Sequence, residues 1–341
     1  MKASLFPAAS FAEVDARLRD LPEFDEAAAA AAQARQGQLT KPPGSLGRLE
    51  DVAVFMAGWR GTARPGIAHA QALVFAGNHG VCAKGVNPYP QEVTVQMVAN
   101  FNAGGAAINQ LCRASGAALA VVALELDRPT ADFTENAAMS EAEVLAAMAK
   151  GAEAVDPKAD ILLLGEMGIG NSTVAAALAT ALFGGLVTDW AGPGTGADAA
   201  VMARKIAAIE AGLARHEAMR QSPLAVLAAF GGREQAAICG AILAARVHRI
   251  PVLLDGFICT AAAAVLEASG VGALAHCLAA HVSAEPGHAR LLEKLGKTPL
   301  LALGMRLGEG SGAAVALTVV RAALAAHDGM STFAEAGVSG A

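Results

Sequence analysis

Residues 159–173 read ADILLLGEMGIGNST. The apolar run 161–164 has the length of a buried strand, and the glycines within 165–170 end it. The polar residues at 171–173 favour helix N-termini, and the Ala-rich run VAAALATAL that follows favours a helix. Backbone N–H groups converge at such a helix start and its dipole favours negative charge, so this order predicts an anion site. Glu166 falls within the turn, where we expect its carboxylate to face the ligand.

Apolar runs of strand length alternate with helical segments along the rest of the chain. We expect helices over 10–36, from Leu49, near Gln91 and from Ser311 or Gly312. Strands are expected within 72–80, 118–126, 224–234, 250–257, 278–288 and 299–312, with a short strand or turn within 186–198. Because strand–helix–strand units cross over with a right hand, this order predicts an α/β fold with a mostly parallel sheet flanked by helices.

Polar and charged side chains follow these apolar runs directly. They are Asn78, His79, Glu166, Arg233, Glu234, Asp255, Ser283, Glu285 and Glu309. Ligands of open parallel sheets bind beyond the carboxyl ends of the strands. We therefore expect these side chains to converge on one edge of the sheet.

The composition excludes several classes of protein. The 341 residues can form one large domain or two, and apolar residues make up 54% of them but aromatic residues only 4%. A net charge of −6 argues against nucleic acid as a partner. Five scattered cysteines without CxxC spacing indicate reduced thiols. The sequence has neither a signal peptide nor an apolar stretch of membrane-spanning length, so we expect a cytoplasmic protein.

Motifs for cofactors, metals and covalent catalysis are incomplete. Gly168 and Gly170 resemble part of a dinucleotide fingerprint, with Asp189 near the distance of a ribose-binding acid, but Thr173 replaces the third glycine. An NAD-dependent oxidoreductase therefore remains an alternative. No Gly-Lys-Ser/Thr follows the glycines, no histidine pair that includes His79 has metal-ligand spacing, and no GxSxG is present. We expect neither a metal nor a cofactor.

Two further segments each have a structural and a functional interpretation. The Pro/Gly-rich loop that contains Lys41 is either a helix connector or a loop over a ligand, with Lys41 and Arg48 facing an anion. Glycines flank Glu309 in GEGSG (308–312). Its carboxylate either stabilises the dipole of the next helix or serves as a general base in a desolvated pocket.

Taken together, several blocks resemble the family of nicotinate-nucleotide:dimethylbenzimidazole phosphoribosyltransferases. They are KPPGSLGRLE, AGNHGV, YPQEVTVQMVANF, GEMGIGNST, GPGTG, FGGREQAAICGAIL, PVLLDGFICTAAA, HVSAEPGH and LGMRLGEGSGAA. These nine blocks occur in this order between about residues 41 and 315.

The resemblance implies a Rossmann-like catalytic domain (65–317), a small helical domain from both termini (1–64 and 318–341) and a homodimer. Glu309 matches the family's catalytic base. The substrate-binding positions that match are Glu166, Gly168, Gly170, Asn171, Gly194, Thr195, Gly196 and Lys205, and the base pocket is carried over to Tyr89 and Gln91.

The implied reaction moves phosphoribose from nicotinate mononucleotide to 5,6-dimethylbenzimidazole and yields α-ribazole 5′-phosphate and nicotinate, a step in building the lower ligand of cobalamin. The sequence leaves the acceptor base open, since a purine, a phenol or another benzimidazole is an alternative. A non-catalytic nucleotide sensor, in which Glu309 only stabilises a helix dipole, is a further alternative.

Overall fold

Five parallel strands form a single sheet within the part of the chain that the computed structural model describes, residues 6–194 and 196–339. The strands are β1 (Ala70–Ala76), β2 (Ala117–Ala123), β3 (Ile161–Met167), β4 (Val252–Leu254) and β5 (Cys277–Ala279). Their order across the sheet is β2-β1-β3-β4-β5, and every neighbouring pair is parallel.

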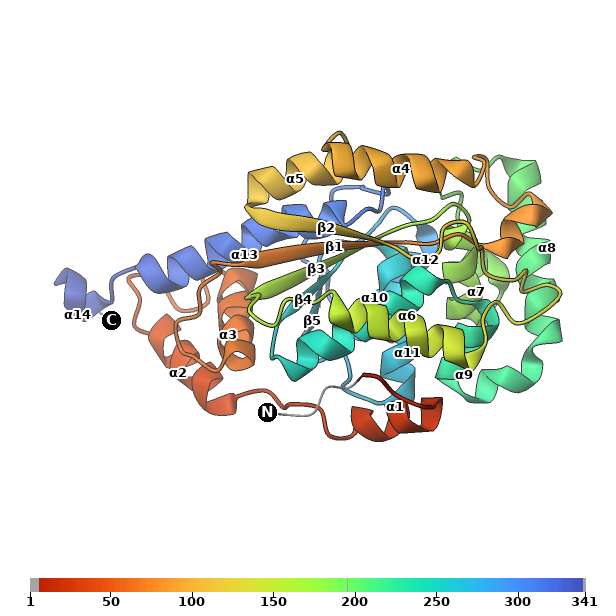
Figure 1. Ribbon diagram of the computed structural model, residues 1–341. Coiled ribbons are helices and arrows are strands. Elements are labelled where there is room, and N and C mark those ends of the chain that lie inside the picture. Colours follow the sequence, from red (N-terminus) through yellow and green to blue (C-terminus); the bar gives the residue numbers. More distant parts are fainter. Residues whose placement is uncertain (1–5, 195, 340–341) are drawn as a thin grey trace.

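Helices cover both faces of this sheet (Figure 1). One face packs against α3 (Arg48–Arg60), α4 (Glu92–Ala103), α5 (Ala107–Ser115) and α13 (Ser311–Gly329). The other packs against α6 (Glu141–Glu153), α7 (Asn171–Phe183), α8 (Ala199–Arg215), α9 (Pro223–Phe230), α10 (Arg233–Val247) and α11 (Phe257–Ser269). Successive residues of β3 alternate between the two cores, with Leu162 and Leu164 in one and Ile161 and Leu163 in the other. The prediction of an α/β fold with a helix-flanked parallel sheet is confirmed.

The strand order places a topological switch between β1 and β3. From β1 the chain moves outward to β2, and from β3 it moves in the opposite direction to β4 and β5. In doubly wound sheets with this order, ligands bind in the crevice beyond the carboxyl ends of the two strands at the switch. Phe75 pairs with Glu166 in the register of β1 and β3, so Glu166 lies at this position.

Two expected strands, within 224–234 and 299–312, are absent from the described residues. The run 224–234 forms α9 and the start of α10, with Ser222 as N-cap and Pro223 at the first helical position. A short apolar run fits a buried helix as well as a buried strand, and this one packs on all sides. The segment 186–198, expected as a short strand or turn, contains a 3₁₀ turn at 187–189. In 299–312, among the described residues, only Leu301 pairs with the sheet edge, through a bridge to His281, because glycines interrupt the segment.

The expected helix over 10–36 is two helices, α1 (Phe11–Leu18) and α2 (Glu26–Gln36). Pro22 lacks the N–H that a continuous helix needs, and Asp25 caps the second helix by accepting from the N–H of Ala28 at 2.9 Å. The remaining helices are α12 (Pro286–Lys294) and α14 (Phe333–Ala336), and 3₁₀ turns form at Gly80–Lys84 and Glu217–Gln221.

Elements from the two ends of the chain lie together (Figure 1). Helix α3 packs against both α2 and α13, and Leu39 pairs with Thr332 in an antiparallel bridge. The division into domains at 64/65 and 317/318 stays a prediction, and the second boundary falls inside α13. Within the described residues no helix has the length and apolar character needed to cross a membrane.

Candidate active site

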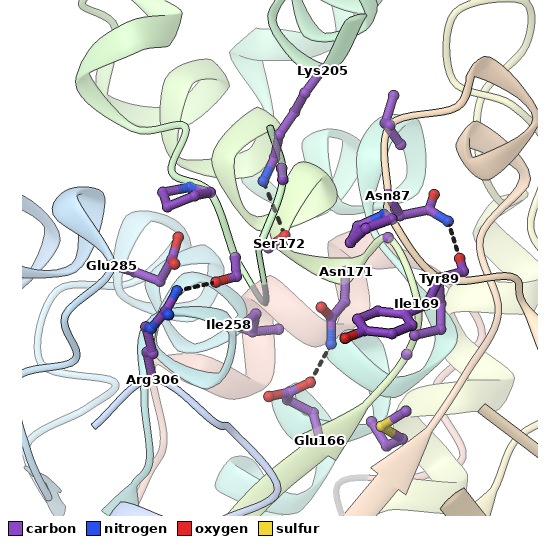
Figure 2. A pocket seen from close by; sticks show the side chains of 18 of the residues that line it. Asn87, Tyr89, Glu166, Ile169, Asn171, Ser172, Lys205, Ile258, Glu285 and Arg306 are labelled. Carbon is purple, nitrogen blue, oxygen red and sulfur yellow. Dashed lines mark hydrogen bonds between the residues drawn. The ribbon is translucent and has the colours of Figure 1, made fainter. Parts of the chain in front are cut away.

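A cavity opens beyond the carboxyl ends of β1 and β3, at the switch point of the sheet (Figure 2). Three groups of residues line it. The loop after β1 contributes 86–89, the end of β3 and the start of α7 contribute 166–172, and later loops and helices contribute Pro193, Gly194, Ala197, Lys205, Ile258, Glu285, Arg306 and Leu307.

The glycine turn between β3 and α7 is held from outside by short contacts. The N–H of Ile169 donates to Thr94 Oγ1 at 3.1 Å, and Cys82 Sγ lies 3.1 Å from the carbonyl of Ile169. Gly170 is the N-cap of α7 and has a φ of 93°, in the left-handed region. The expectation that 171–173 cap α7 is wrong, because no side chain caps this helix. The amide of Asn171 instead donates to the carboxylate of Glu166.

Lys205 supplies a buried cation at one end of the cavity (Figure 2). Its Nζ donates to Ser172 Oγ at 3.0 Å and to the carbonyl of Gly192 at 2.7 Å. Burial lowers the pKa of Lys205 to about 8, and the nearby Glu285 carboxylate opposes this shift. An ammonium group has three N–H donors, and two have partners among the described residues, so a third is left for a ligand beside the N-terminus of α7. This end of the cavity is suited to an anion.

Two carboxylates complete the cavity wall. Glu166 is 4% exposed, and burial, together with the charges of Asp255, Glu234 and Glu309, raises its pKa well above 4.5. Burial also raises the pKa of Glu285, which the Lys205 ammonium partly offsets. Carboxyl groups with raised pKa values in a cavity indicate a functional site.

Glu309 lies next to this wall and is not among the residues that line the cavity. It has a φ of 64°, a left-handed conformation that non-glycine residues seldom adopt. Its side chain is buried, and burial raises its pKa, with the charge of Asp255 acting in the same direction and a hydrogen bond from the Ile108 N–H opposing them. The adjacent Gly308 lies so close to Glu166 that a Cβ on it would be 2.6 Å from Glu166 Oε1.

The other residues implied by the resemblance are only partly brought together. Tyr89, Gly168, Gly170, Asn171 and Gly194 line the cavity with Glu166 and Lys205. Gln91 and Gly196 do not, and the Gln91 amide donates to the carbonyl of His79. Thr195 lies outside the described residues.

Four polar residues that line the cavity were not identified as ligand contacts from the sequence. They are Asn87, Ser172, Glu285 and Arg306. The sequence signal for Ser172 was its place at a predicted helix start, and that for Glu285 was its place after a predicted strand. Arg306 donates to the carbonyl of Gly194 at 3.0 Å and so ties two cavity loops together, and its position three residues before Glu309 was the one sequence signal.

The remaining polar candidates have structural partners. Buried His79 lies with its Nε2 3.1 Å from Glu234 Oε1. Asp189 pairs with Arg290 at 2.5 Å and does not line the cavity, which disagrees with a ribose-binding role and with the NAD interpretation.

The loop with Lys41 and Arg48 also makes structural contacts. Lys41 pairs with Glu50 at 2.8 Å, and Arg48 donates to the carbonyls of Thr298 and Pro299. Neither side chain lines the cavity. Within this chain, therefore, the loop fits the interpretation as a connector.

Comparisons with known proteins agree with this site. A phosphoribosyltransferase family profile matches residues 21–338. Two relatives are named nicotinate-nucleotide–dimethylbenzimidazole phosphoribosyltransferase. The protein from Rhodobacter capsulatus is 62% identical and the one from Novosphingobium aromaticivorans 60% identical to this chain. Each alignment covers 97% of this chain and 98% of the relative. The crystal structure of CobT from Thermus thermophilus is 41% identical and superposes with a TM-score of 0.86 over 92% of this chain and 100% of that one. The chain therefore belongs to the family of nicotinate-nucleotide–dimethylbenzimidazole phosphoribosyltransferases.

Proposed function

We propose that this phosphoribosyltransferase transfers the phosphoribosyl group of nicotinate mononucleotide to 5,6-dimethylbenzimidazole, with α-ribazole 5′-phosphate and nicotinate as products. The observation that carries the proposal is the division of one cavity into a cationic end at Lys205 and a carboxylate wall at Glu166. A nucleotide has an anionic phosphate and a ribose with hydroxyl groups, which need these two kinds of partner.

The cationic end would hold the 5′-phosphate. Lys205 and the N-terminus of α7, with the backbone of 168–171, converge there. Charge-assisted hydrogen bonds to an anion are roughly twice as strong as neutral ones, and helix N-termini favour negative charge. Glu166, and Glu285 near Lys205, would accept from ribose hydroxyls or from the incoming base. Tyr89 and Ile258 offer apolar surface for a ring.

The reaction needs one proton acceptor. A benzimidazole nitrogen attacks C1′ with its lone pair while the C1′–N bond of the nucleotide breaks and returns its electron pair to the pyridinium ring. Nicotinate leaves with a neutral ring nitrogen, so this departure requires no general acid. The other ring N–H of the new benzimidazolium must lose its proton, and we assign its acceptance to Glu309. Attack opposite the leaving group converts the β substrate into an α product in a single inverting step.

Burial suits Glu309 to this role, because a base with a raised pKa takes a proton more readily once ionised. General-base assistance contributes roughly 10²–10⁴-fold to a rate, and alignment of both rings with C1′ contributes the rest. We further propose that the protein acts as a cytoplasmic homodimer without a cofactor.

The test is a chromatographic assay of the purified chain with nicotinate mononucleotide, with and without dimethylbenzimidazole. We expect acceptor-dependent nicotinate release and an α-configured product. Glu309→Gln should lower kcat by about 10²–10⁴-fold. The matched control Glu210→Gln, at an exposed position on α8, should leave kcat unchanged.

Different outcomes of this assay separate the alternatives. If no benzimidazole, purine or phenol acceptor yields product, the transferase proposal fails. If product forms with another base only, the reaction class stands and the acceptor changes. Full activity of Glu309→Gln would remove Glu309 from its role while keeping the transferase.

A further inference from the structure

Glu309 occupies a backbone conformation that its surroundings must stabilise. A left-handed φ is unfavourable for an ordinary L-residue, and Glu309 adopts it at 64° with its side chain buried. Strained conformations of this kind persist only where neighbouring structure holds them. The contacts that hold this loop therefore also decide where the carboxylate lies.

Asp255 makes the strongest of these contacts. It follows β4 directly and is fully buried. Its Oδ2 accepts from the N–H of Gly310 at 3.1 Å, and its Oδ1 accepts from the N–H of Ala313 at 3.0 Å. Helix α13 has no side-chain cap of its own. The Asp255 carboxylate thus binds two backbone N–H groups at the N-terminus of α13 with its two oxygens. It thereby fixes Gly310, the residue next to Glu309.

β3 supports the same loop through Gly165. A Cβ at Gly165 would lie 2.6 Å from the carbonyl carbon of Glu309 and 2.7 Å from its oxygen, distances that no real side chain tolerates. Only a glycine allows the backbone of Glu309 to approach β3 this closely. The loop is thus held between Gly165 and Asp255.

The charged neighbours of this arrangement come from several elements. His281 Nε2 lies 3.6 Å from Asp255 Oδ1, and the His281 ring packs against Gly312. Glu166 interacts electrostatically with both Asp255 and Glu309, Cys259 with Asp255 and Glu166, and Glu234 in turn with Glu166 and Cys259. The carboxylates among them all carry negative charge when ionised, so Asp255 contributes to the field at Glu309 as well as to its position.

We propose that Asp255 is a positioning residue for Glu309, which it acts on by capping α13 and by placing a negative charge beside the loop. The inference rests on the proposed role of Glu309 as the base. Asp255 is fully buried and both of its carboxylate oxygens accept from backbone N–H groups, so it acts through the loop and not on the substrate. A displacement of about 1 Å at a reacting group can lower a rate by about 10²-fold, even from a distant mutation.

Asp255→Asn tests the proposal, because the amide keeps the size of the side chain but directs an NH₂ group at one of the two N–H donors. We expect kcat to fall by about 10–100-fold while KM for nicotinate mononucleotide changes by less than about threefold. The charge of Asp255 raises the pKa of Glu309, so its removal should also move the acid limb of the kcat–pH profile to lower pH. A purely structural cap would leave that limb in place.

Two more variants complete the experiment. Asp25→Asn makes the same carboxylate-to-amide change at the N-cap of α2, far from the cavity, and should change neither kcat nor the pH profile. Gly165→Ala should displace the loop while Asp255 keeps its charge, so kcat should fall without the shift of the acid limb. If Asp255→Asn does not fold, Gly165→Ala still tests whether the position of the loop that carries Glu309 determines kcat.

The outcomes distinguish the two proposals. Wild-type kcat and an unshifted acid limb in folded Asp255→Asn, or wild-type kcat in Gly165→Ala, overturn the positioning role. A wild type without acceptor-dependent turnover, or a fully active Glu309→Gln, overturns the proposed function instead.

Discussion

Lys205 Nζ lies 3.0 Å from Ser172 Oγ, so one hydrogen bond joins the middle of α8 to the first turn of α7. Lys205 is 1% exposed, and its ammonium is buried without an ion pair at contact distance among the described residues. A buried charge without a close counter-ion is costly for a protein. A bound phosphate would supply the missing negative charge.

Lys205→Met should therefore weaken binding of the nucleotide rather than slow the chemical step. Hydrogen bonds to charged groups contribute about 1.5–3 kcal/mol, which corresponds to a rise of roughly 10–100-fold in KM for nicotinate mononucleotide. Steady-state kinetics at saturating acceptor measure this, with Lys294→Met at an exposed position as the control. An unchanged KM would exclude Lys205 from the anion site.

The pH dependence of KM should reveal the same group. The pKa of Lys205 is lowered to about 8, so the ammonium loses its proton as the pH rises through that value. The phosphate monoester, with a second pKa of about 6, remains a dianion over this range. We expect KM for the nucleotide to rise above about pH 8 in the wild type and to stay flat in Lys205→Met, because only the wild type loses a charge. Parallel profiles for the two proteins would contradict this assignment.

Gly170 should tolerate no side chain. A Cβ there would be 2.5 Å from Cys82 Sγ, in a left-handed conformation with φ 93°. Gly61 is also left-handed, with a φ of 65°, and an added Cβ would meet only Asp25 Oδ2 at an ordinary 3.5 Å, so Gly61→Ala reports the backbone strain of about 1–2 kcal/mol. The contact with Cys82 adds about 1–3 kcal/mol of overpacking to this strain. We therefore expect Gly170→Ala to lower the free energy of unfolding, measured in urea, by that much more than the control substitution does.

A second substitution checks the cause of this loss. Cys82→Ala in the Gly170→Ala background removes the atom that the new methyl group meets, so the overpacking part should largely disappear. Equal stability of Gly170→Ala and Gly61→Ala would show that the contact with Cys82 has no effect.

The sequence predicted the sheet well where periodicity and glycine turns act locally. Strands β1 to β5 all overlap expected runs, because Val- and Leu-rich segments that end in glycine leave few other structures open. The strand predicted for 224–234 is wrong because its alanines and leucines suit a helix as well as a strand. Its packing against helices such as α11 favours the helix. Propensity is a weak guide where tertiary burial is complete.

The sequence predicted which residue types meet at the site better than it predicted the long-range contacts that hold them. The glycine turn, Lys205 and Glu166 meet because the topology brings β3, α7 and α8 together, as expected from the motifs. The role of Asp255 as the cap of α13 depends on a contact across 55 residues of sequence, which no local pattern encodes. The ion pair between Asp189 and Arg290 could not be predicted from the sequence for the same reason.

Glu166→Gln should stabilise the protein, and increasingly so as the pH rises. Glu166 is held in the fold with a pKa well above 4.5, mainly by burial and by the charges of Asp255, Glu234 and Glu309. Between 4.5 and that raised pKa the folded state keeps a proton that the unfolded state has lost, so wild-type stability falls as the pH rises. A glutamine at this position does not titrate, still accepts from the Asn171 amide and avoids this loss. We expect the difference in Tm between Glu166→Gln and wild type, measured by calorimetry, to grow as the pH rises from about 5 and to level off once the pH passes the raised pKa of Glu166. Glu210→Gln at its exposed position should show a constant difference. A difference that shrinks with pH would mean that Glu166 is ionised and stabilising in the fold.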